Sequence, residues 1–313
     1  MKNPFINGNP FEPEPFNVLK FWERNSYVGQ YGVPYLDREL LGISKSDLVL
    51  IGARSGAGKS SLAKIIYQTN DKTKTALFSL ENYDGDLEML MLRKDYNKRT
   101  KSNYTAREWQ LGPRNLNENE LGAALGKIQK DMDGAFIFGR KPPVEYGDSW
   151  TVESLTKMII WCAQHGIELI IIDHLDYLDR DNPDESDNSH VTELMKSIRE
   201  AQELGSAVVA FSHLRKPAGR SDEVVIPNEN EFIGSSNKVK QATQVIMFAP
   251  ANDGDSKDGY GTWCRICKNR NGGITGNVAK LTYMPSTETY KPGYSICAAN
   301  YSGTRISFLE HVD

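Results

Sequence analysis

The feature that most constrains this chain is a short glycine-containing stretch, Ala53-Arg54-Ser55-Gly56-Ala57-Gly58-Lys59-Ser60-Ser61. The residues before it, 47–52, contain β-branched side chains and are apolar enough for a buried strand. The residues after it, 61–67, have apolar side chains at helical spacing. A strand, a glycine-bearing loop and a helix in this order predict a phosphate-binding loop, and hence a protein that binds a nucleoside triphosphate.

Within this loop, Lys59 is expected to reach the β- and γ-phosphate oxygens, and the Ser60 hydroxyl to ligate Mg²⁺. Ala53 occupies the first slot of the motif G-x-x-x-x-G-K-[ST], and because that slot only closes the turn, we expect the change to be tolerated. A chance match on a surface loop is the alternative, which the flanking strand and helix disfavour. The residues expected to surround the phosphates are Arg54, Ser55, Gly56, Ala57, Gly58, Lys59, Ser60 and Ser61.

Composition narrows the class of protein. The 313 residues are 39% hydrophobic and 25% charged, which is ordinary for a globular protein with a sizeable core. The formal net charge of −4 excludes a wholly basic nucleic-acid-binding surface, but not a local basic lining. No apolar run approaches the roughly 20 residues that span a bilayer, so we expect no membrane partner. The N-terminus lacks the apolar core of a signal peptide, and four cysteines give no disulfide framework, which together indicate a cytoplasmic protein.

Cys264 and Cys267 have the C-x-x-C spacing of some metal and redox sites. They lie in an alternating, strand-like run, and residues three apart on a strand point to opposite faces. Without a second pair, structural cysteines are favoured over a metal or redox site.

Strand-like runs alternate with helical patterns along the rest of the chain. Helices are expected at 61–67, within 84–133, at 151–165 and at 191–204, the last two stopped by Gly166 and Gly205. This alternation predicts an α/β fold with a mostly parallel twisted sheet flanked by helices, extended by antiparallel strands toward the C-terminus. The strands are expected at 47–52, 74–82, 135–138, 168–173, 207–213, 244–248, 263–268 and 278–283.

The chain divides into two unequal parts. Residues 1–28 are predicted to form an extended, proline-rich leader and a short helix with an aromatic face, which either packs on its own domain or docks on a neighbouring subunit. Residues 29–313 contain no internal repeat and no clear linker, and so predict one nucleotide-binding domain.

Three polar residues end predicted strands, at the edge where ligands bind in such sheets. Asp173 is placed to hold Mg²⁺ through a water, although a turn or helix-capping aspartate is the alternative. Glu81 is placed to orient and deprotonate the water that attacks the γ-phosphate, although a solvated glutamate is the alternative. His213 is placed to donate a hydrogen bond to the γ-phosphate, although a lone histidine is more often structural.

Lys268 and Arg270 lie two residues apart near the end of a predicted strand, and so project from one face. Two cations presented together suit a triphosphate, particularly one bound by an adjacent subunit, where an arginine stabilises transition-state charge. A basic hairpin tip in solvent is the alternative.

Taken together, these segments resemble the DnaB type of hexameric replicative helicase in the RecA-like superfamily. Phe78-Ser79-Leu80-Glu81 resembles the motif with the catalytic glutamate, Asp173 the Walker B aspartate, and Ser212-His213-Leu214 the sensor motif, which has His in the phage helicase–primase and Twinkle branch. The segment 268–272 resembles the strand with the trans-acting lysine and arginine finger. The resemblance covers about residues 30–290 and implies a RecA-like P-loop ATPase that uses ATP and Mg²⁺, forms a hexameric ring around single-stranded DNA, and works in the cytoplasm, that of a bacterial host if a phage encodes it.

The DNA-binding stretch departs from the family pattern. The family has Arg-x-Ser-Gly and then an acidic Ala-Asp, whereas this chain has Ile233 in place of the arginine and Thr243 in place of the aspartate. Loops of this kind follow a strand's phosphates without reading sequence. The candidates for DNA contact are Arg215, Lys216, Arg220, Asn237, Lys238 and Lys240.

The sequence therefore predicts an ATP-dependent helicase or translocase that acts on single-stranded DNA in replication. A nucleotide-switched DNA-binding regulator, or a recombinase-like ATPase that does not unwind DNA, is the alternative that Ile233 favours. A metabolite kinase is a third option, for which no lid or substrate pocket is visible in the sequence.

Overall fold

The computed structural model describes residues 18–54, 56–82, 85–179, 187–215, 226–232, 236–251, 259–273 and 275–313. The predicted leader at residues 1–17 lies outside this part of the chain. The helices are α1 (Val18–Arg24), α2 (Pro34–Leu40), α3 (Lys59–Thr69), α4 (Asp86–Thr100), α5 (Ala106–Gln110), α6 (Glu118–Asp131), α7 (Val152–Gln164), α8 (Asp187–Glu203) and α9 (Ser236–Gln241). Short 3₁₀ turns occur at η1 (Val144–Tyr146), η2 (Leu175–Tyr177) and η3 (Glu229–Glu231).

The strands are β1 (Tyr27–Gly29), β2 (Ile43–Ser44), β3 (Leu48–Ala53), β4 (Thr75–Ser79), β5 (Phe136–Phe138), β6 (Leu169–Asp173), β7 (Ala207–His213), β8 (Gln244–Pro250), β9 (Tyr260–Asn269), β10 (Asn277–Met284), β11 (Thr289–Tyr290), β12 (Tyr294–Ala299) and β13 (Ile306–Val312). All but the β1–β2 pair form an 11-stranded sheet, in the order β13-β12-β10-β9-β8-β3-β7-β6-β4-β5, with β11 beside β10.

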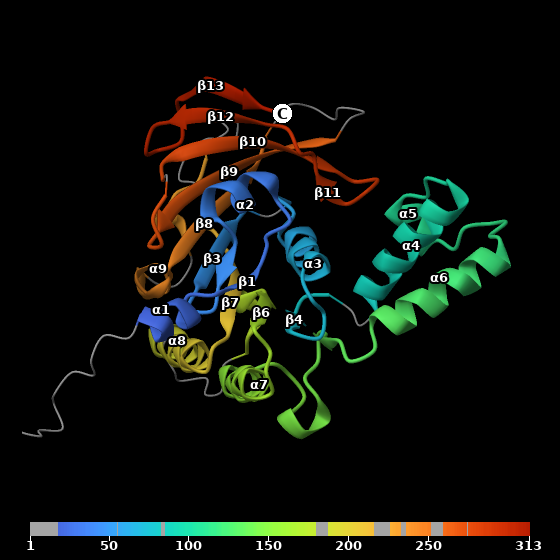
Figure 1. The fold of residues 1–313 in the computed structure, drawn as a ribbon, viewed down its shortest axis with the longest axis horizontal. Coiled ribbons are helices and arrows are strands. Elements are labelled where there is room, and N and C mark those ends of the chain that lie inside the picture. Colours follow the sequence, from blue (N-terminus) through green and yellow to red (C-terminus); the bar gives the residue numbers. More distant parts are fainter. Residues whose placement is uncertain are drawn as a thin grey trace, which may run out of the picture.

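Strands β8, β3, β7, β6, β4 and β5 run parallel, whereas β9 to β13 are antiparallel to their neighbours. These antiparallel strands form the upper part of the molecule in Figure 1. We call the edge at which β3, β4, β6 and β7 end the carboxyl edge of the sheet, and the opposite one the amino edge. The mostly parallel sheet with an antiparallel C-terminal extension is the architecture that the sequence predicted.

The parallel strands are covered on both faces, which explains their unbroken apolar sequences. In β3, alternate residues belong to two separate core clusters: Val49 and Ile51 pack with α2 and α3, whereas Leu48 and Leu50 pack with α7 and α8. Figure 1 shows α7 and α8 together below the sheet. The sheet therefore has little freedom to shift its register, because a slip by one residue would exchange the two faces.

Local signals fix the helix ends where the sequence predicted them. Thr151 caps α7 by accepting a hydrogen bond from the Ser154 N–H, and Gly166 beyond its end has a φ of 83°.

The cysteines of the C-x-x-C pair point to opposite faces of the sheet, as predicted. Cys264 packs in the cluster with α2 and α3, whereas Cys267 packs against the cluster on the other face.

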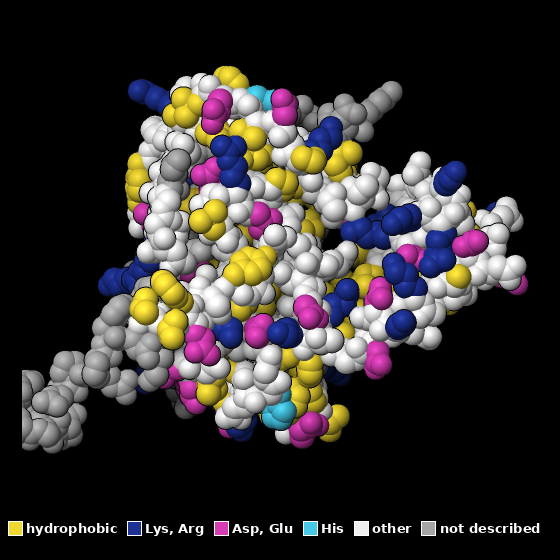
Figure 2. All heavy atoms as spheres, in the orientation of Figure 1, with side chains coloured by type: hydrophobic (Ala, Val, Ile, Leu, Met, Phe, Trp, Pro, Cys, Tyr) yellow, Lys and Arg dark blue, Asp and Glu magenta, His cyan; other side chains and the backbone are white. Residues whose placement is uncertain are grey.

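Helices α4, α5 and α6 form an arm that projects from the body of the molecule (Figure 1). Lys and Arg side chains gather on the arm (Figure 2), although part of this charge is neutralised locally. Asp95 of α4, for example, forms ion pairs with Arg99 and with Lys127 of α6, the latter at 2.8 Å. Within the described residues, no helix is both long and apolar enough to cross a membrane.

Candidate nucleotide site

The predicted phosphate loop connects β3 to α3 at the carboxyl edge. Gly56 and Gly58 have φ values of 78° and 82°, a region that favours glycine, and a Cβ on Gly56 would meet nothing within 4 Å. The described loop backbone therefore curves in front of the helix N-terminus, where N–H groups attract an anion. Ser55 lies outside the described residues.

Lys59 is the first residue of α3 and is largely buried. Its Nζ lies 3.0 Å from Nδ1 of His213, at the end of the neighbouring strand β7. Burial lowers the pKa of Lys59, and the charges of Asp173 and Glu81 oppose that shift. The structure thus brings the predicted lysine and the predicted histidine into direct contact.

Asp173 ends β6 between β4 and β7, and it is 1% exposed. Burial raises its pKa, while a hydrogen bond from Ser60 opposes the shift. Its Oδ1 makes no hydrogen bond with any described group. A buried carboxylate oxygen without a donor, beside the Ser60 hydroxyl, is the hard oxygen set that Mg²⁺ prefers. The two residues predicted to hold the metal therefore fit it.

Glu81 lies just beyond the end of β4, at the same edge, with 40% of its side chain exposed. The Tyr177 hydroxyl donates a hydrogen bond to its Oε1 at 3.2 Å. Nε2 of the buried His174 lies 3.4 Å from its Oε2, without the geometry of a hydrogen bond. The carboxylate is thus held from one side and open to water on the other, as a general base needs to be.

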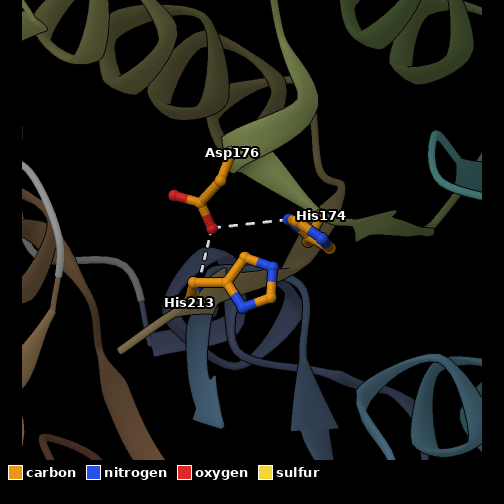
Figure 3. Close-up of side chains that lie close together, drawn as sticks. All are labelled: His174, Asp176 and His213. Atoms are coloured by element: carbon orange, nitrogen blue, oxygen red, sulfur yellow. Dashed lines mark hydrogen bonds and ion pairs between the residues drawn. The ribbon is translucent and has the colours of Figure 1, made fainter. Parts of the chain in front are cut away.

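Asp176, in the turn after β6, holds the end of β7. Its Oδ2 accepts a hydrogen bond from the His213 backbone N–H at 2.5 Å, and its Oδ1 accepts one from the Ser212 hydroxyl at 3.2 Å. Figure 3 shows the carboxylate of Asp176 facing both His174 and His213, and the rings of these two histidines meet edge to face at 4.2 Å between centroids. Burial, followed by the nearby His174 and Lys59, lowers the pKa of His213, so its ring favours the neutral form.

The residue types of His174, Asp176 and His213 could suit a transition metal, and their ligand atoms lie within 4.8 Å of one another. The surroundings argue against a resident cation. Asp176 already accepts two hydrogen bonds, and two ammonium groups lie beside the cluster: Lys59 next to His213, and Lys238 at 3.8 Å from Asp176. The cluster is therefore better described as a hydrogen-bonded support for the nucleotide site.

Lys268 and Arg270 lie at the amino edge, away from the phosphate loop of their own chain. Lys268 pairs with Val245 near the start of β8, whereas the loop follows Ala53 at the end of β3. Both cations donate to the Lys240 carbonyl of α9, at 3.2 Å from Lys268 and 2.7 Å from Arg270, so they share a face as predicted. Burial, together with the charge of Arg270, lowers the pKa of Lys268.

A carboxylate does lie beside Thr243, at the position where the resemblance leads one to expect an aspartate. The Thr243 hydroxyl donates to Oδ1 of the buried Asp47 at 2.8 Å. The side chain of Asn271 donates to the same oxygen at 2.8 Å, and the Arg270 N–H donates to the Thr243 carbonyl at 2.9 Å. Asp47 thus supplies the missing acidic group from another strand end and anchors the segment with Arg270.

The candidate DNA contacts differ in how far their side chains are exposed. Arg215 and Lys240 are exposed. Lys238 is buried, with its Nζ 3.3 Å from the Ser212 hydroxyl and ion-paired with Asp176, so it is not available to the phosphates of a strand in this conformation. This corrects the prediction that Lys238 contacts DNA. Lys216, Arg220, Ile233 and the side chain of Asn237 lie outside the described part of the chain.

A cavity of about 550 Å³ opens beside the phosphate loop. It extends away from Asp173 and His213, toward the antiparallel strands, and three tyrosines line it. Its size and aromatic lining suit a ribose and a base whose phosphates point into the loop. The lining residues are Gly56, Ala57, Gly58, Ser61, Pro250, Ala251, Tyr260, Gly261, Thr262, Tyr283 and Tyr290.

Sequence reasoning missed the roles of His174, Asp176 and Tyr177, which contact Glu81 and His213. Their position directly after Asp173 was a usable signal, because the residues that follow a strand's carboxyl end share its edge of the sheet. It also missed the three tyrosines of the cavity, which come from strands far apart in the sequence.

Bacterial replicative DNA helicases are similar to this chain in sequence. The chain is 26% identical over 274 residues to the replicative DNA helicase DnaB of Treponema pallidum (strain Nichols). The matched region covers 84% of this chain and 56% of that protein. It is 27% identical over 234 residues to DnaB of Geobacillus stearothermophilus, covering 72% of this chain and 48% of that one. The chain thus spans about half the length of the curated relatives it matches.

Solved structures share the fold. One of them, described as an ATPase domain, superimposes with a TM-score of 0.66 at 18% identity, over 87% of this chain and 94% of that one. A DnaB-like replicative helicase, described with its interactions with primase, gives the same TM-score and identity over 87% of this chain and 65% of that one. The predicted RecA-like ATPase fold is confirmed. The family model for the DnaB-like helicase C terminal domain matches residues 30–292, most of the sequence, so the chain belongs to that family.

Proposed function

We propose that this chain is an ATP-dependent DNA helicase or translocase of the DnaB type that acts on single-stranded DNA in replication. The observation that carries the proposal is the convergence of Lys59, Glu81, Asp173 and His213 at one edge of the sheet, around a loop shaped for phosphates. Membership of the DnaB-like family supports the same activity.

The site would use ATP with Mg²⁺. Ser60 and Asp173 would hold the ion, which neutralises charge on the β- and γ-phosphates. Lys59 would donate to the same phosphates, and would leave its contact with His213 to do so. Glu81 would orient and deprotonate the attacking water, while the neutral His213 would donate to the γ-phosphate. The base would lie in the cavity beside Tyr260, Tyr283 and Tyr290.

We further propose that ATP lies between subunits of a hexameric ring. Lys268 and Arg270 are at the edge opposite their own phosphate loop, so they suit the nucleotide of a neighbouring subunit. Helix α1 exposes Leu19 and Trp22, at 69% and 64%, as expected of a segment at residues 1–28 that docks on a neighbour. Residues 29–313 would then form the ATPase domain.

Single-stranded DNA would contact Arg215 and Lys240, both exposed, together with Lys216, Arg220 and Asn237. A primase is a reasonable further partner, because a structural neighbour is described with one. We place the protein in the cytoplasm, and its origin in a phage stays a prediction.

Unwinding of a forked duplex by the full chain tests this function. Wild type should separate the strands only with ATP and Mg²⁺, and Lys59→Ala should abolish both unwinding and hydrolysis, because the β/γ-phosphates lose their cation. Glu81→Gln should still bind nucleotide but hydrolyse it at least about 100-fold more slowly, since it lacks the base. A wild type that hydrolyses ATP and binds DNA without separating strands would instead support the non-unwinding regulator or recombinase-like ATPase, which the burial of Lys238 favours.

A further inference from the structure

The turn after β6 contacts two sides of the site that lie on different elements. His174 and Tyr177 face Glu81, whereas Asp176 faces the end of β7. These three side chains come from four consecutive residues, so none can move far without the others. The turn thus connects the candidate base to the candidate γ-phosphate sensor.

Asp176 also reaches a third element. Lys238, in α9, lies with its Nζ 3.8 Å from Asp176 Oδ1 and 3.3 Å from the Ser212 hydroxyl, which itself donates to Asp176. Lys238 is only 4% exposed. Burial raises the pKa of Asp176, but contact with His174, the charge of Lys238 and the His213 N–H together hold it below its usual range.

The backbone of helix α9 is also held by the two candidate trans-acting cations. Lys268 donates to the Val239 carbonyl at 2.7 Å, and Arg270 donates to the Lys240 carbonyl at 2.7 Å. The same short helix follows directly on the segment that begins at Ile233, where the resemblance leads one to expect DNA contacts. Helix α9 therefore contacts Asp176 through the side chain of Lys238, and contacts Lys268 and Arg270 through its backbone carbonyls.

We propose that Asp176 and Lys238 are a positioning pair that fixes the end of β7, and with it His213, relative to α9. A shift of α9 would then move His213 at the γ-phosphate. The inference rests on the proposed function, in which His213 faces that phosphate. A buried ion pair adds little stability over an apolar pair of the same shape, but either charge left alone is strongly unfavourable, so the pair specifies a position.

The test compares single and double variants of the full chain. Lys238→Met and Asp176→Asn should each lower the kcat of ATP hydrolysis at least about tenfold while the KM for ATP stays within about twofold, because the phosphate loop with Lys59 and Ser60, which would hold the phosphates, is not changed. Lys238→Arg keeps a cation and should retain most of the activity. The double variant Asp176→Asn with Lys238→Met should be no slower than the slower single variant, because both substitutions break the same ion pair.

The matched control is Lys157→Met, which removes an exposed ion pair with Glu153 at 2.6 Å on α7 and should leave kcat unchanged. Thermal melting identifies variants that fail to fold. Normal kcat in folded Lys238→Met and Asp176→Asn would overturn the proposal. The proposal would also be overturned if Lys238→Arg lost as much kcat as Lys238→Met. Stimulation of the wild type by single-stranded DNA tests the proposed function separately, because the pair is judged on hydrolysis without DNA.

Discussion

Ala53 stands at the junction between β3 and the phosphate loop, where the loop motif has glycine. Its methyl group is 1% exposed and packs in the core, and its φ is not positive. Neither conformation nor space therefore requires glycine here, in contrast to Gly56 and Gly58. The turn begins one residue later, which is why the loop keeps its shape.

Replacing this residue tests that account. Ala53→Gly should lower the free energy of unfolding by about 0.5–1 kcal/mol, because a strand residue gains freedom in the unfolded chain and a buried methyl is lost. Nucleotide affinity should not change. Urea denaturation and titration with a fluorescent ATP analogue measure the two effects, and tighter nucleotide binding in the variant would show that the loop does need glycine at this position.

At the same scale, the sequence located Lys59, Asp173, Glu81 and His213 correctly at one edge, because strand ends can be read from apolar runs. It could not place Lys238. A lysine in a short polar segment is usually solvated. Only the fold shows that Lys238 forms an ion pair with Asp176, which is 62 residues earlier in the sequence. Partners that meet through tertiary structure leave no periodic pattern in the sequence.

At the scale of elements, a buried ion pair attaches the arm to the sheet. Arg93 of α4, 2% exposed, pairs with Glu288, in the turn between β10 and β11, and donates to the Tyr104 carbonyl at 3.0 Å. Burial raises the pKa of Glu288, and the charge of Arg93 opposes that shift. The attachment of the arm thus relies on an arginine in the middle of α4.

Arg93→Met should therefore destabilise the protein by about 3 kcal/mol at pH 8, because Glu288 is left charged and buried. Without the arginine the pKa of Glu288 rises further above its unfolded value. Protonation then relieves the cost as the pH falls, so the loss should be smaller at pH 5. Thermal melts at both pH values check this, with Lys157→Met as a surface control. An equal loss at both would contradict the role of Glu288.

The elements themselves were predictable to different degrees. The parallel strands and α7 were found because buried apolar runs and capping residues are local signals. Strands β11 to β13 were not predicted, since β13 is an edge strand that leaves Phe308 and Leu309 exposed and so lacks a buried face of its own. Helices α2 and α9 were also missed, because each is short and depends on tertiary contacts more than on propensity.

At the scale of the whole molecule, the proposed function divides the nucleotide site between two groups of residues at opposite edges of one chain's sheet. The phosphate loop, Asp173 and His213 are at the carboxyl edge, and Lys268 and Arg270 are at the amino edge. A contact between the carboxyl edge of one copy and the amino edge of the next is heterologous, and heterologous contacts form a ring when the rotation between copies closes. The division of the site therefore predicts that neither half works alone.

Mixing two inactive variants tests this division. Arg270→Ala should reduce hydrolysis by roughly 10³-fold, because no arginine then stabilises the charge of the transition state. Lys59→Ala should abolish hydrolysis. In mixed rings, an Arg270→Ala subunit still has an intact phosphate loop. A neighbouring Lys59→Ala subunit still has Arg270 and can complete that site, so activity should reappear. The control is a chain with both substitutions, which should restore nothing when mixed with Lys59→Ala. If the two single variants assemble together and remain inactive, Arg270 does not act across the subunit boundary.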